Sequence, residues 1–303
     1  MSDLVSSREA YGHEIDLWDE IKEIGWLQTP FLSSLSDSAP SARTNPGFGH
    51  KWKFMDVPDG AINKHLEGAP SPTVTKFAMG EALNHYQIFK NAFGVSGSEE
   101  KAVGIDNKKE LARQGNMSRI QHMKSIEMAL CGEQAAVQRV TSGTEVAGEL
   151  AGVKHFLTSN TDHDMSAAAL TWDMILGLLE VNYMKGIPIT HIMMNTKQKN
   201  AIDKLLFAKT TGTNFGQSSI SNNVRTLGDT AYGNDIKIIL SPFLATTEIL
   251  GYNKEYVTPV IWRPTSIKDI LKDQDGTSKQ YLTEMTLRVD HEFAIGRLKN
   301  LAA

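Results

Sequence analysis

The sequence has few of the residues that mark secreted, membrane-spanning or nucleic-acid-binding proteins. A single cysteine, Cys131, excludes an intrachain disulfide and fits a reducing compartment. No apolar stretch reaches the roughly 18 residues that a bilayer requires, and the polar start, Met1 to Glu9, lacks a signal-peptide core. With 31 Lys and Arg against 35 Asp and Glu, the net charge of −4 argues against dedicated nucleic-acid binding, which needs clustered cations.

Motifs with a known chemical mechanism are missing too. There is no G-x-x-x-x-G-K, no G-x-G-x-x-G after a strand and no H-E-x-x-H. The segment 94–98 fails the G-x-S-x-G spacing because Ser98 stands where the last glycine should be, so Ser96 is interpreted as a helix cap. Asp162, His163 and Asp164 could bind a metal only with remote ligands that nothing in the sequence indicates. We expect no cofactor, no metal and no catalytic residue.

What remains is an ordinary globular composition, 41% hydrophobic and 22% charged, in 303 residues. Residues 1–45 suggest an arm with one short helix over 15–25 and a linker over 33–49. Aromatic strand signals follow at 50–54 and 83–93, separated by a proline-rich loop far longer than a hairpin turn. Because an isolated hairpin is marginal in water, this projection implies a partner that covers it.

A long helical region follows, opened by Ser96 and Glu99 at capping-box spacing and running to Leu130. Cys131 directly after it is interpreted as a packed thiol. Apolar residues recur at every third position of this helix, which predicts neighbours on more than one side: Met117, Ile120, Met123 and Ile126. Its alternating charges indicate a solvated or ion-paired face.

The C-terminal half indicates a small α/β domain followed by strands. Thr171 caps a helix that ends at Gly186, and glycines break the chain before it, over 142–164, where we expect a domain crossing. The remaining predicted elements are a strand over 189–194, a helix over 196–207, a polar loop over 209–223, and strands over 236–240, 249–252, 257–262 and 281–293.

Several short stretches keep the order of a known family over nearly the whole chain: Gln28-Thr29-Pro30-Phe31, His50-Lys51-Trp52, Leu66-Glu67-Gly68, Val95-Ser96-Gly97-Ser98, Glu127-Met128-Ala129-Leu130-Cys131-Gly132 and Leu170-Thr171-Trp172-Asp173-Met174. In these stretches the chain resembles the tailed-bacteriophage major capsid (major head) protein family. The resemblance implies an α+β chain with the Hong Kong 97-type phage capsid fold. Its implied parts are an N-terminal arm (1–46), an extended β-hairpin loop (47–93), a spine helix with the peripheral domain (94–164), an axial α/β domain (165–250) and terminal strands that return to the peripheral domain (251–303).

The function that this resemblance implies is structural. The chain would be a major capsid protein that self-assembles, as pentamers and hexamers, into an icosahedral or prolate head shell around packaged phage DNA. A portal would be a partner, scaffolding and decoration proteins stay open, and the DNA contact would be weak and non-specific, without a membrane. The location would be the virion, with assembly in the host cytoplasm. The candidate inter-subunit contacts are His50, Trp52, Phe54, Glu67, Tyr86, Phe89, Arg113 and Arg119.

Three other functions stay open at this point. A nanocompartment shell protein of the same fold would carry a cargo-binding groove. A metal-dependent hydrolase would use Asp162, His163, Asp164 and other carboxylates. A tail or adhesin protein would form trimers or monomers instead of closed particles.

Overall fold

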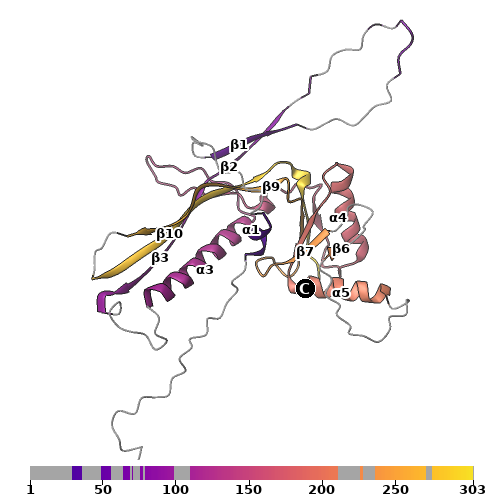
Figure 1. Cartoon of the computed structure of the whole chain (residues 1–303). Coiled ribbons are helices and arrows are strands. Elements are labelled where there is room, and N and C mark those ends of the chain that lie inside the picture. Colours follow the sequence, from indigo (N-terminus) through magenta and orange to yellow (C-terminus); the bar gives the residue numbers. More distant parts are fainter. Residues whose placement is uncertain are drawn as a thin grey trace, which may run out of the picture.

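The computed structural model describes residues 29–35, 49–55, 64–68, 70, 76–77, 79–98, 110–210, 226–227, 236–270 and 275–302. In these residues the chain forms one projecting hairpin and two sheets that lie side by side, each packed against helices (Figure 1). No helix in these ranges is long and apolar enough to cross a bilayer. The helix expected over 15–25 and most of the linker expected over 33–49 lie outside the described residues.

The projecting hairpin pairs β1 (Gly49–Phe54) with β2 (Gly80–His85) in antiparallel register (Figure 1). The predicted single strand over 83–93 is wrong, because the chain breaks at Tyr86 and continues as β3 (Gln87–Ser96) in another sheet. The buried Asn84 side chain fixes this break. Its amide donates to the carbonyls of Leu287 and Ala151, at 2.7 and 3.2 Å, and accepts from the Ala151 N–H at 2.8 Å.

The first sheet has the order β3-β10-β9, with β10 (Gly276–Val289) antiparallel to both β3 and β9 (Val257–Asp269). Helix α3 (Glu110–Leu130) packs on one face of it (Figure 1). Ser96 ends β3, and Gly97 and Ser98 directly after it are helical, which agrees with the predicted helix start. Residues 99–109 lie outside the described part, and α3 is described from Glu110.

Most of α3 buries one face against the first sheet, with buried residues three or four apart: Gly115, Ser118, His122, Ile126 and Leu130. Glu127 is buried as well and contacts α1, so the prediction of neighbours on more than one side is confirmed only at the C-terminal end of α3. Met117 and Met128, on other sides of the helix, stay exposed. At Gly115 a Cβ would lie 3.1 Å from the Phe93 ring, so a glycine lets the helix approach β3 closely.

The second sheet has six strands in the order β4-β11-β8-β5-β7-β6. Their bounds are Asp162–Asp164 for β4, Ile295–Lys299 for β11, Ile249–Tyr252 for β8, His191–Met194 for β5, Ile236–Leu240 for β7 and Thr226–Leu227 for β6. Helices α4 (Trp172–Met184) and α5 (Thr196–Thr210) accompany this sheet (Figure 1). The Thr171 cap is confirmed, because its hydroxyl accepts from the Met174 N–H at 3.4 Å.

The terminal strands divide between the two sheets. Strand β10 ends at Val289, and the short 3-10 helix η3 (Glu292–Ala294) leads the chain into β11. Strand β11 pairs with β4 and β8 in the second sheet, so the expectation that 251–303 return together to one domain is wrong for its last strand. Parallel pairing with β11 also makes 162–164, the end of the predicted domain crossing, a strand.

Helix α1 (Pro30–Leu35) joins the core where the two sheets meet, so the predicted linker over 33–49 is wrong for its first residues, 33–35. Phe31 and Leu35 are buried with Leu130, Cys131 and Tyr252 in one apolar cluster. Burial raises the pKa of the Cys131 thiol well above its ordinary value, and the prediction of a packed thiol is confirmed. The α/β half has its own cluster beneath α4.

One polar residue links α3 to the first sheet. The buried His122 ring donates through Nδ1 to Asn91 Oδ1 at 2.8 Å and accepts through Nε2 from the Thr283 hydroxyl at 2.7 Å. It lies between the rings of Phe89 and Tyr281. Burial lowers the pKa of His122, so the neutral ring is the form that fits.

We expect His122→Leu to lower the free energy of unfolding by about 1 to 3 kcal/mol, because polar partners lose their hydrogen bonds. A histidine whose folded pKa is lowered stabilises the fold fully above its unfolded pKa, about 6.5, and less as the pH falls. Denaturant melts from pH 8 to 5 should therefore show a steeper loss in the wild type than in His122→Leu. The exposed His65→Asn is the control, and equal slopes for wild type and His122→Leu would contradict this role.

Candidate assembly surfaces

Of the three residues of the possible metal site, Asp162 and Asp164 are engaged in structural pairs, whereas His163 Nε2 is buried without a hydrogen-bond partner in the described part of the chain. Asp162 accepts from Arg297 Nε and Nη2, at 2.8 and 2.9 Å, and from Lys299 Nζ at 2.7 Å. Asp164 accepts from the Ser166 N–H at 2.9 Å and from the Asn300 amide at 2.9 Å. In the described ranges no three His, Cys, Asp or Glu side chains are grouped so as to hold a metal ion. The side chains of Asp162 and Asp164 thus fasten β4 to β11 and to the residue that follows it.

Arg297 is the centre of this fastening. Its guanidinium is buried and also donates to Glu133 Oε2 and Oε1, at 2.9 and 3.3 Å. Glu133 comes from the loop after α3, so Arg297, on β11, joins that loop to the edge strand β4. Hydrogen bonds from Arg297 hold the pKa values of Asp162 and Glu133 below their ordinary values, against the opposing effect of burial.

The hairpin has one face on the body and one in solvent. Trp52 is only 5% exposed, and its ring lies 6.1 Å from that of Phe156. Phe54 meets the His291 ring edge-on at 5.6 Å. On the opposite face Leu83, 48% exposed, stands across from Lys51. Strand alternation explains this division, because successive side chains point to opposite faces.

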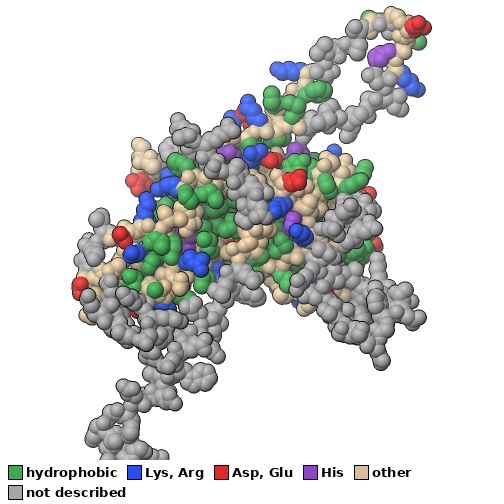
Figure 2. Space-filling model, viewed as in Figure 1, with side chains coloured by type: hydrophobic (Ala, Val, Ile, Leu, Met, Phe, Trp, Pro, Cys, Tyr) green, Lys and Arg blue, Asp and Glu red, His purple; other side chains and the backbone are tan. Residues whose placement is uncertain are grey.

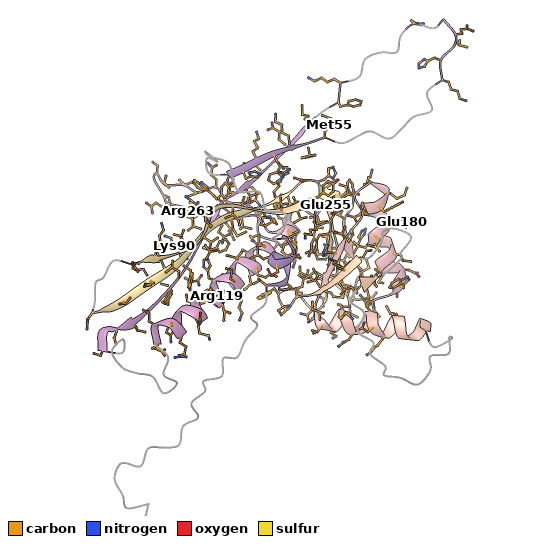
Figure 3. All side chains as sticks on the ribbon, in the orientation of Figure 1. Met55, Lys90, Arg119, Glu180, Glu255 and Arg263 are labelled. Atoms are coloured by element: carbon orange, nitrogen blue, oxygen red, sulfur yellow. The ribbon has the colours of Figure 1, made fainter. Side chains whose placement is uncertain are left out.

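Beyond the last strand pair the projecting segment carries uncovered apolar side chains, and Figure 2 shows hydrophobic groups along it. Leu66 is 86% exposed. Three more large side chains near the ends of β1 and β2 are at least half exposed: Met55, Phe77 and Met79. Met55 directly follows β1 (Figure 3). A two-stranded hairpin has no core of its own in which to bury them.

The eight candidate contacts fall into two groups. Trp52, Tyr86 and Phe89 are buried in their own subunit, so the expectation that these rings form contacts with a neighbour is not supported by their burial. Tyr86 lies 5.4 Å from Trp262, and Phe89 faces His122 under α3. The other five are at least partly accessible, and their contact with a neighbour stays a prediction: His50, Phe54, Glu67, Arg113 and Arg119.

Among these five, Arg113 is engaged within α3 by Glu110, whose carboxylate accepts from its Nε at 2.8 Å. Glu67 lies in the outer part of the projecting segment and Arg119 on α3 (Figure 3). Neither Glu67 nor Arg119 is needed by the subunit core.

Two buried carboxylates were missed by sequence reasoning. Glu284, on β10, has no solvent exposure and receives Arg139 Nη2 at 2.5 Å and Arg263 Nε at 2.6 Å. Glu127, near the end of α3, accepts two backbone N–H groups of α1. The sequence carried a signal for Glu284, because it is the one charged residue in the apolar and Thr-rich stretch 282–287. A charge buried in such a strand needs a partner, so this pattern indicates that cations from other parts of the chain pair with it.

Comparison with known proteins gives one family. The family model described as SU10 major capsid protein matches residues 4–302. No curated protein matches.

Solved structures that share the fold include shells from three sources. A cyanophage A-1(L) capsid subunit is 11% identical, with full coverage of both chains and a TM-score of 0.71. A native GTA particle capsid is 13% identical, with 98% coverage of each chain and a TM-score of 0.66. The SrpI encapsulin from Synechococcus elongatus PCC 7942 is 11% identical, covers 74% of this chain and 78% of its own, and has a TM-score of 0.55.

Trp52→Ala should lower the free energy of unfolding by about 3 to 5 kcal/mol, because it empties a buried aromatic site. Leu83→Ala, on the solvent face of the same hairpin, should change it by no more than about 0.5 kcal/mol. Chemical denaturation of unassembled subunits measures both. Equal effects of the two changes would mean that the hairpin does not rest on the body through Trp52.

Asp162→Asn should weaken the subunit at neutral pH and reduce its sensitivity to acid. A carboxyl group whose folded pKa is lowered contributes stability above its unfolded pKa, about 3.9, and loses it as the pH falls through the lowered folded value. The melting temperatures of wild type and variant should therefore differ at pH 7 and converge toward pH 3. Asp173→Asn, exposed on α4, is the control, and a constant difference at all pH values would refute the ion-pair role.

Proposed function

From the premise that this chain belongs to the SU10 major capsid protein family, we propose how its subunits build a shell. The chain is a bacteriophage capsid protein of the virion, a shell-forming structural subunit and not an enzyme. It has the Hong Kong 97-type fold and self-assembles into an oligomeric shell. What needs proposing is which of its parts make the contacts.

In our proposal the hairpin of β1 and β2 with its outer segment is the extended loop (47–93), and α3 is the spine helix of the part spanning 94–164. The sheet with α4 and α5 supplies the axial domain (165–250), to which β4 and β11 add two strands from outside that range, and β9 and β10 return to the peripheral domain beside α3. The arm (1–46), apart from α1, which packs in its own subunit, and the extended loop reach neighbouring subunits, while axial domains gather at the centres of pentamers and hexamers. Different patches of one chain then meet, as ring-forming heterologous contacts require.

The observation that carries this assignment is the uncovered outer part of the hairpin. Its root is fixed by Asn84 and Trp52, so it projects in one direction from a rigid body. Its outer part exposes Leu66, Phe77 and Met79, which gain stability only when another surface covers them. In a shell made of identical subunits, each subunit contacts one neighbour through this segment and is contacted by the same segment of another.

Charge on the hairpin's solvent face suits a polar rim around that apolar contact. Lys51 and Lys53 both pair with Glu81, and hydrogen bonds from Lys51 are the main cause that lowers the pKa of the Glu81 carboxyl. These side chains are well exposed, so their pairs add little stability to the isolated subunit. Their role in our proposal is to orient the hairpin against a neighbour.

The remaining partners follow from the shell. We propose a portal at one vertex, packaged double-stranded DNA in weak, non-specific contact with the inner surface, and assembly in the host cytoplasm before release in the virion. An icosahedral or prolate form is equally compatible with this subunit. The net charge of −4 supports weak DNA contact, because each phosphate contact by Lys or Arg would add to a salt-sensitive grip.

A nanocompartment shell is the second candidate, favoured by the likeness to the SrpI encapsulin. That likeness covers 74% of this chain, whereas the likeness to the cyanophage subunit covers all of it. Particles that enclose a specific protein cargo and no DNA in the native host would favour the nanocompartment.

Replacing 57–79 with a short Gly-Ser turn should leave the subunit folded, because both apolar clusters lie elsewhere. Closed shells should fail to form, since every subunit loses the same contact. Circular dichroism measures folding, and analytical ultracentrifugation measures assembly. A shortened protein that still closes into full-sized particles would show that this segment is not an assembly element.

A further inference from the structure

Helix α1 is attached to the body by a capping interaction that reaches across the chain. The Phe31 and Leu32 N–H groups, in the first turn of α1, donate to Glu127 Oε1 and Oε2 at 2.7 and 2.9 Å. Such groups have no partner inside a helix and are usually satisfied by a side chain just before it. Here the cap comes from α3, 96 positions along the chain from Phe31.

The position of Glu127 is unfavourable for a carboxylate in every other respect. Its side chain has no solvent exposure, and it lies in the last turn of α3, where the helix dipole disfavours negative charge. No Lys, Arg or His of the described ranges forms an ion pair with it. Burial accordingly raises the pKa of Glu127, while the two amide hydrogen bonds lower it. The two N–H donors of α1 therefore offset the cost of burying the Glu127 carboxylate.

The other contacts of α1 hold it at the same place. The Ser34 hydroxyl lies 2.6 Å from the Tyr252 hydroxyl, and the Phe31 ring meets the Tyr252 ring edge-on at 5.1 Å. Phe31 and Leu35 fill the apolar cluster between the sheets. These contacts fix how closely α1 packs against the body. The two hydrogen bonds to Glu127 also fix the rotation of α1 about its own axis, because two N–H donors must face two carboxylate oxygens.

We propose that Glu127 is a positioning residue for assembly: it holds α1 against the end of the spine helix and so fixes the point at which the proposed arm is joined to the body. The partner is a second copy of this chain, which the arm meets from that fixed point. This inference rests on the proposed role of the arm, and it extends that role by naming Glu127 as the residue that fixes where the arm is attached.

The test uses Glu127→Gln, with Glu180→Gln on the exposed side of α4 as the matched control (Figure 3). A glutamine keeps the volume, but its NH₂ group must face one of the two N–H donors, so one bond is lost. In the unassembled subunit, hydrogen exchange over 29–35 should speed up about tenfold or more, while exchange in α3 stays slow. Assembly should then give open or irregular particles under the electron microscope.

The exchange and assembly readouts distinguish the possible failures. Unchanged exchange over 29–35 would overturn the attachment itself. Faster exchange with normal shells would overturn the positioning role and leave the proposed function intact. If all segments exchange faster together, Glu127 only stabilises the fold, and the inference is wrong.

If Glu127→Gln does not give soluble protein, Tyr252→Phe loosens α1 from its other side by removing the Ser34 bond. It should give a milder form of the same result, with faster exchange confined to 29–35 and fewer regular particles. Regular shells despite that faster exchange would again overturn the proposal.

Discussion

The hairpin of β1 and β2 exposes more apolar surface than its own subunit can cover, and this imbalance explains much of the structure. Two strands have no interior, so Leu66, Phe77 and Met79 stay exposed in the single subunit, and in our proposal a neighbouring subunit covers them. A projecting segment can meet the same site on every neighbour only if its direction is fixed. The body fixes the direction of the hairpin through Asn84, at the break between β2 and β3, and through Trp52 beneath the hairpin.

Buried charges sit at the joints between elements. Glu127 joins α1 to α3, Glu284 joins β10 to the chain around Arg139, and Arg297 joins β4 and β11 to the loop after α3. Burying a charge contributes little net stability, but removing one partner is costly. Such pairs therefore favour one relative placement of the parts over near alternatives, which suits a subunit that must repeat the same contacts around a shell.

Local signals allowed much of the α/β half to be predicted. The Thr171 cap, the strands over 236–240 and 249–252 and the helix from Thr196 each have boundaries set by nearby residues, and the structure confirms them. Long-range contacts decided what was missed. Tyr86 ends β2 because Asn84 bonds to residues 67 and 203 positions away, and the N-terminal cap of α1 is supplied by α3. The candidate contacts were chosen by residue type, and strand alternation then placed Trp52 inward and Leu83 outward.

The central claim is that the exposed apolar side chains of this subunit are covered only in a closed shell of its own copies. Electron microscopy of the purified wild-type chain, at concentrations above and below the onset of assembly, tests it most directly. The account predicts hollow, closed particles of uniform size, with rings of subunits resolved as pentamers and hexamers. A population made only of stable monomers or trimers at every concentration would contradict it.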